Sequence, residues 1–179
     1  MSSQHTNTRK AVPSDLGEIK AIADAERDSF GFLTRGTIRE AIEQGQIMVI
    51  VVNGNIAGFQ HYYHRKRDLQ TTFYHKAVRK EWRGQGLGRR LVDAVVDEAR
   101  ALGRAKIVLK CPVDLPSNRF HGEYGFVLVG QELGRKRKLN VWQYVLQPIG
   151  MTQLSSDVPR VAEPTAVDDE KEFGNGHQR

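Results

Sequence analysis

The sequence predicts a single mixed α+β (α/β) domain whose central sheet is largely antiparallel and flanked by helices. Runs rich in β-branched and aromatic residues, separated by turn signals, predict three consecutive strands before residue 80. A helical pattern over 87–102 then leads to an apolar strand at 105–110, and strand–helix–strand order is typical of a parallel pair. At 179 residues and 39% hydrophobic content, the chain suits one domain with its own core.

Two helices are expected before the sheet. Residues 13–27 follow a helical period and begin with Pro13-Ser14-Asp15, a common helix start. The apolar face of this helix contains Leu16, Ile19, Ile22 and Ala23. A shorter helix over 37–44 is expected to end at Gly45.

The next three segments predict an antiparallel meander. Strands at 46–52 and 55–63 are joined by Asn53-Gly54, which is the strongest short hairpin signal. A turn near Arg67-Asp68 leads to a third strand at 70–78. Each strand of the meander therefore pairs with the next one along the chain.

The second half of the domain begins with a strongly amphipathic helix over 87–102, which Gly103 ends. The residues that this helix is expected to bury are Leu87, Leu91, Val95, Ala99 and Leu102. The remaining elements are a strand at 105–110, a helix at 117–124 and strands at 126–132 and 140–147.

The ends of the chain differ from its middle in composition. We expect residues 1–10 to be a flexible segment and residues 11–148 to form the folded domain. After Pro148 the periodicity stops and Ser, Asp, Glu, Gly and Pro dominate, so 149–179 is expected to be disordered.

Composition excludes several classes of protein. No apolar run approaches the roughly 20 residues of a membrane span, and the polar stretch 1–10 lacks the apolar centre of a signal peptide. The single cysteine, Cys111, excludes an internal disulfide framework and is interpreted as a core or strand-end thiol. We therefore expect a cytoplasmic protein with no membrane partner.

The net charge of +6 is unevenly distributed along the chain. Residues 151–179 carry −3, so the rest of the chain carries +9. Much of this positive charge lies in three clusters, at 65–67, 89–90 and 135–138. Such clusters attract anionic partners, including nucleic acid, although the first and third are equally compatible with solvated turns.

The most informative segment joins the third strand to the long helix. Glycines at alternate positions, Gly84, Gly86 and Gly88, precede the helix, and a glycine-rich turn at a helix N-terminus is a receptor for phosphate. A Walker loop is excluded because Gly88 is followed by Arg89-Arg90 rather than by Lys and Ser or Thr. A dinucleotide fingerprint is excluded because the order is G-x-G-x-G and the next strand ends at Lys110.

The spacing Arg83-x-x-Gly86-x-Gly88, after Ala77-Val78, resembles the coenzyme A pyrophosphate loop of the GNAT N-acetyltransferase superfamily. The segment Asn118 to Phe126 resembles a later segment of the same family, in which an Asn opens a helix and Gly-Phe begins the next strand. The resemblance covers roughly residues 10 to 147. It implies the GNAT-like acyl-CoA N-acyltransferase fold and acetyl-CoA as co-substrate.

The resemblance also implies which residues bind that co-substrate. In this family the third strand splays from the next one, the pantetheine arm enters the gap, and the glycine turn holds the pyrophosphate. Carried over, the cofactor-binding residues are Ala77, Val78, Arg79, Arg83, Gly84, Gln85, Gly86, Leu87, Gly88, Arg89 and Asn118.

The catalytic residues are less clearly indicated. The family's usual general acid is a Tyr four residues before the Gly of Gly-Phe, and this chain has His121 there. His121 as imidazolium, Tyr124 on the same helix, or no side chain are the alternatives for the acid. The family's frequent basic Glu is replaced by His75, and a turn centred on Asp68 places His61 opposite His75.

These histidines also have interpretations that involve no catalysis. Each is equally a surface or edge-strand residue, and this is the preferred interpretation of His61. A zinc site built from His61, His64 and His75 is disfavoured, because residues three apart on a strand face opposite sides and no Cys or carboxylate completes the set. We expect no metal.

The leading hypothesis is an acetyl-CoA-dependent N-acetyltransferase in which a primary amine of a small molecule, peptide or protein attacks the thioester directly in a ternary complex. One alternative is a GNAT-like enzyme that modifies nucleic acid or a nucleobase. Another is a non-catalytic domain that senses coenzyme A or binds nucleic acid. The exposed edges of such a sheet also suit a homodimer.

Overall fold

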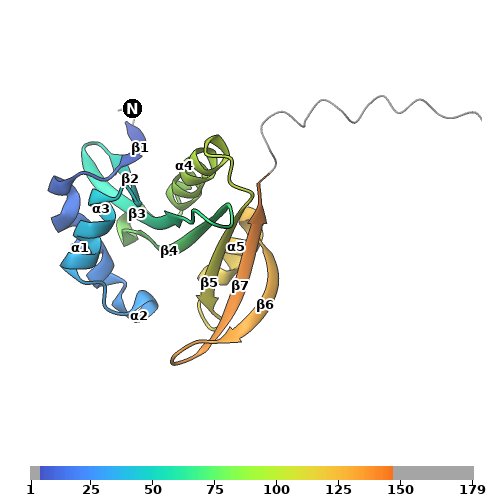
Figure 1. Cartoon of the computed structure of the whole chain (residues 1–179). Coiled ribbons are helices and arrows are strands. Elements are labelled where there is room, and N and C mark those ends of the chain that lie inside the picture. The colour runs from blue at the N-terminus through green and yellow to red at the C-terminus, as the bar shows by residue number, and fades with distance from the viewer. Residues whose placement is uncertain (1–4, 147–179) are drawn as a thin grey trace, which may run out of the picture. The chain divides into compact units, whose positions relative to one another are not determined.

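The computed structural model describes residues 5–146 (Figure 1). The tail expected to be disordered, 149–179, lies outside the described residues. Between the strands and helices, Pro13–Asp15 and Lys80–Trp82 form short 3-10 turns. The elements in chain order are β1 (Thr6–Lys10), α1 (Leu16–Ala25), α2 (Arg27–Phe30), α3 (Arg35–Glu43), β2 (Ile47–Val52), β3 (Asn55–His64), β4 (Gln70–Val78), α4 (Leu87–Ala101), β5 (Lys106–Pro112), α5 (Ser117–Tyr124), β6 (Val127–Leu133) and β7 (Lys138–Val145).

One seven-stranded sheet organises the domain, in the order β1-β2-β3-β4-β5-β7-β6. Every neighbouring pair is antiparallel except β4 and β5, which are parallel. A parallel pair needs a crossover connection, and α4 provides it. The predicted mixed, largely antiparallel sheet flanked by helices is thus confirmed.

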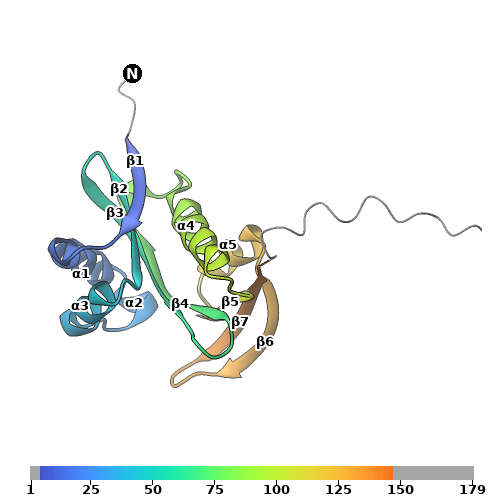
Figure 2. The same ribbon diagram turned by 45° about the horizontal axis from the view of Figure 1, so that its top comes forward.

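Helices cover both faces of the sheet (Figures 1 and 2). α1 and α3 pack on one face through a cluster that includes Ile19, Ile38 and Phe59. α4 packs on the other face against β2, β3 and β4, and its fully buried residues include Leu91 and Val95. No helix within residues 5–146 is long and apolar enough to span a membrane.

The hairpin predictions hold at the level of individual residues. Asn53 and Gly54 both adopt the left-handed conformation, with φ of 48° and 85°, as a tight hairpin turn requires. In the β3–β4 hairpin His61 pairs with His75, as the turn centred on Asp68 predicts. A β-bulge between His61 and Tyr62 shifts the register, so pairs nearer the turn, such as Tyr62 with Phe73, are offset by one residue from this pattern.

Three expectations about the elements were wrong. Residues 6–10, within the segment expected to be flexible, form β1 and pair antiparallel with β2. An edge strand with half-exposed side chains needs no apolar alternation, so the sequence Thr-Asn-Thr-Arg-Lys gives no strand signal. The predicted helix 13–27 is divided into a 3-10 turn, α1 and α2. Leu102, expected to be buried, is 51% exposed because α4 ends before it.

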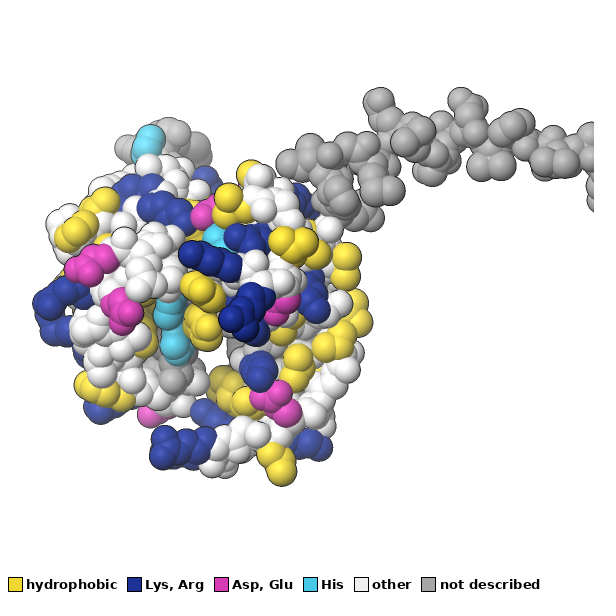
Figure 3. All heavy atoms as spheres, viewed as in Figure 1, with side chains coloured by type: hydrophobic (Ala, Val, Ile, Leu, Met, Phe, Trp, Pro, Cys, Tyr) yellow, Lys and Arg dark blue, Asp and Glu magenta, His cyan; other side chains and the backbone are white. Residues whose placement is uncertain are grey.

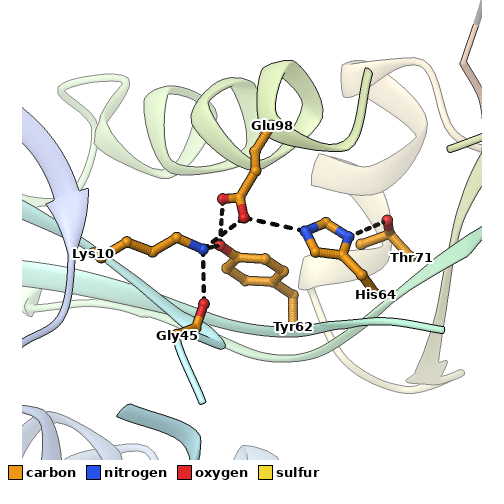
Figure 4. A network of polar contacts seen from close by, with 6 residues as sticks. All are labelled: Lys10, Gly45, Tyr62, His64, Thr71 and Glu98. Carbon is orange, nitrogen blue, oxygen red and sulfur yellow. Dashed lines mark hydrogen bonds and ion pairs between the residues drawn. The ribbon is translucent and has the colours of Figure 1, made fainter. Parts of the chain in front are cut away.

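A charged network fixes α4 on the sheet (Figure 4). Glu98 accepts hydrogen bonds from Tyr62 (2.5 Å), Lys10 (2.6 Å) and His64 Nε2 (3.2 Å). The other ring nitrogen of His64 lies 2.8 Å from the Thr71 hydroxyl. The network joins β1, β3, β4 and α4, so it ties the edge strand to the helix that follows the glycine turn.

Candidate active site

The two parallel strands at the centre of the sheet separate halfway along their length. β4 and β5 pair from Gln70 opposite Lys106 to Phe73 opposite Leu109, and no further. Beyond this point β4 stays with β3 as far as Val78, whereas β5 stays with β7. The strands therefore splay at this point, as the family resemblance implied.

A cavity of about 660 Å³ opens at this splay. On the face shown in Figure 3, histidine and Lys or Arg side chains gather beside an opening between the half that carries α1–α3 and the half that carries β5–β7. The cavity is lined by residues of both halves, among them Glu26, Gln60, His75, Lys76, Cys111 and His121.

The cavity is also where polar groups are left without partners. Within residues 5–146, four buried side-chain N or O atoms have no hydrogen-bond partner. Three of these, Gln60 Oε1, Lys76 Nζ and His121 Nδ1, belong to residues that line this cavity. Buried polar groups are nearly always satisfied in native proteins, so this concentration indicates a site that a ligand completes.

The glycine turn has the geometry of an anion receptor. Gly84 and Gly86 adopt positive φ of 77° and 75°, and Gly86 is the N-cap residue of α4. No backbone hydrogen bond is formed by the N–H groups of 84–88. A Cβ on Gly84 or Gly86 would meet nothing within 4 Å, so the turn is open on its outer side. Free N–H groups at the positive end of a 15-residue helix suit a pyrophosphate.

The end of β4, beyond its pairing with β5, is held by packing on both faces of the sheet. Ala77 is buried against α1 and α3, and Val78 packs on the opposite core cluster. Gly58 lies opposite Val78, where a Cβ would come within 2.5 Å of the Ala77 carbonyl oxygen. The close approach of β3 thus fixes the backbone that the resemblance assigns to the pantetheine arm.

The predicted arginines have partners of their own. Arg79 donates to the Ile56 carbonyl (2.8 Å) and pairs with Glu18 (3.3 Å). Arg83 donates to the Val78 carbonyl (2.9 Å) and pairs with Glu26. These two side chains therefore connect the segment that leads into the turn to β3, to β4 and to α1 and the residue after it.

Arg89 lies on the other side of the turn. Its guanidinium is 4.9 Å from the centre of the Tyr124 ring, and it donates to the Glu123 carbonyl (3.2 Å). Arg89 therefore joins the start of α4 to the end of α5. The N–H of Arg89 is directed to the Gly86 carbonyl (3.1 Å), so the free N–H groups of the turn end at residue 88.

Comparison with known proteins identifies the family. The family model described as "Acetyltransferase (GNAT) family" matches residues 18–126, which is more than half of the chain. The chain belongs to the GNAT acetyltransferase family. The matched residues contain the splayed strands, the glycine turn and most of the cavity.

Three relatives illustrate the match. The 5-NmdU N-acetyltransferase of Pseudomonas phage PaMx11 is 27% identical over 129 residues, which are 70% of this chain and 90% of that protein. Ard1 from Thermoplasma volcanium superposes with a TM-score of 0.71 at 21% identity, covering 79% of this chain and 98% of Ard1. The structure of yncA from Salmonella typhimurium with its cofactor acetyl-CoA gives 0.68 at 22% identity, covering 80% and 95%. These likenesses show that the chain has the GNAT fold.

The two histidines of the β3–β4 hairpin lie against one another. Their Nδ1 atoms are 3.3 Å apart, their rings stack with centroids 5.5 Å apart, and His75 lines the cavity. Burial, together with the charge of the His75 ring, lowers the pKa of His61 to about 4, and burial also lowers the pKa of His75. Both rings are therefore neutral near pH 7, which leaves them able to accept a proton.

His121 lies in the slot of the family's acidic tyrosine, and its role as the acid stays a prediction. The residue is 9% exposed, and its ring packs among Phe120, Phe126 and Trp142. Burial and the nearby Lys76 ammonium lower its pKa to about 3. The imidazolium form is thus scarce near neutral pH, which argues against acid catalysis by this ring.

The other two predicted residues of α5 have structural partners. The Tyr124 hydroxyl donates to Asp93 of α4 (2.7 Å), which with burial raises the pKa of the phenol, and Tyr124 does not line the cavity. Asn118 donates to the Pro112 and Leu115 carbonyls (2.7 and 2.9 Å). Its Oδ1 accepts from Asn140 and Trp142 (2.9 and 3.0 Å), so its amide holds the loop before α5. Its contact with a pantetheine arm stays a prediction.

Sequence reasoning missed Gln60 and Lys76 as cavity residues. The signal was available, because the turn centre that pairs His61 with His75 also pairs Gln60 with Lys76. A lysine in a central strand with helices on both faces is itself unusual, since lysine is almost never buried without a partner. Neither residue belongs to a recognisable motif, so motif spacing alone does not single them out.

The third basic cluster lies at the cavity. Arg135, Lys136 and Arg137, in the β6–β7 turn, line its rim. Arg137 is neutralised by Asp114 (3.0 Å), whereas Arg135 and Lys136 are exposed and form no ion pair within the described residues. The rim opposite α1 and α2 is therefore positively charged.

Proposed function

We propose that this protein transfers the acetyl group of acetyl-CoA to a primary amine by direct attack in a ternary complex. The observation that carries this proposal is the splay of β4 from β5, where three residues with unpartnered buried polar atoms line one cavity. The open glycine turn follows the splayed end of β4 along the chain. Membership of the GNAT acetyltransferase family supports the reaction class.

The proposed donor site begins at the glycine turn. The free N–H groups of residues 84–88, aided by the dipole of α4, hold the pyrophosphate. The backbone of residues 77–79 binds the pantetheine arm along the splayed edge of β4. Acetyl-CoA itself supplies the activated acetyl thioester.

The proposed base is His75, supported by His61. Both rings are neutral near pH 7 because of burial, and His75 faces the cavity. His75 takes the proton that the attacking amine must lose, directly or through water. The contact with His61 orients the ring, because one Nδ1–H donates to the other Nδ1.

A substitution at Gly86 tests the donor site. Gly86→Asp places a carboxylate at the helix N-terminus, whereas Gly86→Asn has the same shape, tolerates the left-handed conformation equally and carries no charge. We expect calorimetry to show acetyl-CoA binding to the natural protein, a modest loss in the Asn variant and a further loss of about 100-fold in the Asp variant, as expected for like charges a few ångströms apart. Equal affinities of the two variants would contradict the assignment.

Acetyl transfer is measured separately as thiol release with a panel of small amines, peptides and proteins. Turnover with one amine supports the proposed function. Acetyl-CoA binding without turnover across the panel would instead favour a non-catalytic, coenzyme A-sensing domain.

The basic rim favours a second candidate, in which the amine belongs to nucleic acid or a nucleobase. Arg135 and Lys136 stand at the mouth of the cavity, and the similarity to the 5-NmdU N-acetyltransferase supports the same class of acceptor. Arg135→Gln with Lys136→Gln should weaken DNA or RNA binding and reduce its salt dependence. The matched control is Arg65→Gln with Lys66→Gln, which removes the same charge at a turn that does not line the cavity. No binding at low salt would exclude this candidate.

A further inference from the structure

Lys76 is the most unusual residue in the cavity. Its Nζ atom is buried without a hydrogen-bond partner and lies 3.1 Å from the centre of the Phe120 ring. The side chain comes from β4 next to His75, at the point where β4 has separated from β5. Directly across the hairpin is Gln60, whose Oε1 is also buried without a partner.

Such a position is costly for a charged group. An ammonium that is removed from water is stabilised only by a partner, and here a single aromatic face provides it. Burial lowers the pKa of Lys76 to about 7. Lys76 therefore exchanges its proton within the pH range in which enzymes work.

The groups around Lys76 decide where this proton can go. Cys111 on β5 and His121 on α5 both lie near Lys76, whose charge lowers the pKa of His121. His75 on β4 and Glu26 at the end of α1 line the same cavity, and Glu26 is already paired with Arg83. His121 is neutral, and the Cys111 thiol is held protonated because burial raises its pKa. Among these groups, Lys76 is the one that can act as a cationic acid near pH 7.

We propose that Lys76 is the catalytic acid of this chain and gives its proton to the sulfur of coenzyme A as the acetyl group leaves. This inference rests on the proposed function. It explains why the slot of the family's acidic tyrosine can hold a histidine, since Lys76 and His121 line the same cavity. It also gives the buried ammonium the partner that it lacks.

The proton balance of the step is closed. The C–N bond of the new amide forms and the C–S bond of the thioester breaks. His75 takes one proton from the amine, and Lys76 gives one proton to the sulfur, so the products are an amide and a free thiol. The proton on His75 and the vacancy on Lys76 are then restored by exchange with solvent, and no oxidant or further reactant is required.

The test uses Lys76→Met, with Lys106→Met as the matched control. Methionine keeps the length and the contact with Phe120 but removes the buried charge, so we expect folding stability to stay equal or rise. Lys106 lies at the start of β5, away from the cavity. We expect kcat of Lys76→Met to fall at least 100-fold, and the descending limb of the kcat–pH profile above pH 7 to disappear. Lys106→Met should keep both.

A second measurement needs no acceptor. Calorimetry compares coenzyme A with desulfo-coenzyme A, which lacks the sulfur atom. We expect the natural chain to bind coenzyme A about tenfold more tightly, the equivalent of one charge-assisted hydrogen bond, and Lys76→Met to bind the two equally. A purely structural role of Lys76 would not change this ratio.

The outcomes separate this inference from the proposed function. If the natural chain transfers acetyl groups but Lys76→Met keeps kcat within threefold or keeps the preference for coenzyme A, Lys76 is not the acid and the proposed function stands. If the natural chain transfers no acetyl group to any amine, the proposed function fails and the catalytic role of Lys76 fails with it. The ligand comparison then still decides whether Lys76 contacts the sulfur.

Discussion

The stability of this domain should depend on the carboxylate of Glu98, which extends from α4 to the sheet. Glu98→Gln keeps the shape of the side chain but removes its charge and one of its two acceptor oxygens. In the structure Glu98 accepts from Tyr62, Lys10 and His64 at 2.5, 2.6 and 3.2 Å (Figure 4). Tyr62 is 1% exposed, so its hydroxyl has no water to replace a lost acceptor.

The expected magnitude follows from these three contacts. A hydrogen bond to a charged group contributes about 1.5–3 kcal/mol and a neutral one about 0.5–1.5 kcal/mol, so each contact loses about 1 kcal/mol when the charge is removed. Because the Lys10 side chain is 42% exposed, water screens its contribution. We therefore expect Glu98→Gln to lower the free energy of unfolding by about 2–3 kcal/mol.

The same contacts predict how stability depends on pH. Burial alone would raise the pKa of Glu98, but hydrogen bonds from His64, Lys10 and Tyr62 outweigh it and lower the pKa to about 2. A depressed carboxyl pKa contributes stability above the unfolded value of 4.5, and this contribution is lost as the pH falls towards 2. The difference between natural chain and variant should therefore be full at pH 7 and shrink below pH 4.5.

Urea unfolding between pH 3 and pH 8, followed by circular dichroism, measures both effects. The matched control is Asp97→Asn, the adjacent residue on α4, whose side chain is 76% exposed and only 3.4 Å from Arg100. We expect the control to change the free energy of unfolding by less than about 0.5 kcal/mol. A loss below about 1 kcal/mol in Glu98→Gln, or a loss that does not shrink in acid, would refute the reasoning.

Three further substitutions have specific expected outcomes. Gly58→Ala should lower the free energy of unfolding by about 1–3 kcal/mol and weaken acetyl-CoA binding, because its Cβ would lie 2.5 Å from the Ala77 carbonyl oxygen. In the control Gly130→Ala the new Cβ meets nothing within 4 Å, so the affinity measured by calorimetry should not change. Burial and the neighbouring histidine lower the pKa of His61 to about 4, so between pH 6.5 and pH 4 only the unfolded chain takes up this proton. The free energy of unfolding should therefore fall as the pH drops through this range, and His61→Gln should make that fall smaller in urea unfolding measurements. Asn118→Ala should lower the free energy of unfolding, measured by thermal denaturation, by about 2 kcal/mol because it leaves the Asn140 and Trp142 donors without an acceptor. Asn118→Asp should lose at least as much, because its second carboxylate oxygen faces the Pro112 and Leu115 carbonyls; a stability equal to that of the natural chain would contradict this.

The β3–β4 hairpin illustrates what local sequence signals can predict. The turn near Asp68 and the two flanking strands were enough to predict that His61 pairs with His75. A β-bulge between His61 and Tyr62, which no turn signal predicts, separates this pair from the pairs nearer the turn. The α4 pattern likewise predicted Leu91 and Val95 as core, because helical period and burial are linked. In contrast, β1 is polar and its pairing depends on β2 being available, so no local signal could reveal it.

The sequence by itself determined the fold class, the glycine turn and the family, because turn residues, periodicity and a short backbone-binding motif are local properties of the chain. Only the tertiary structure decided the chemistry of the cavity. In the folded chain Arg83 pairs with Glu26, burial keeps His121 neutral, and the Lys76 ammonium is buried without a hydrogen-bond partner. The physical reason is that burial and the distance between charges set a pKa and a hydrogen-bond partner, and both arise only when segments far apart in the sequence pack together.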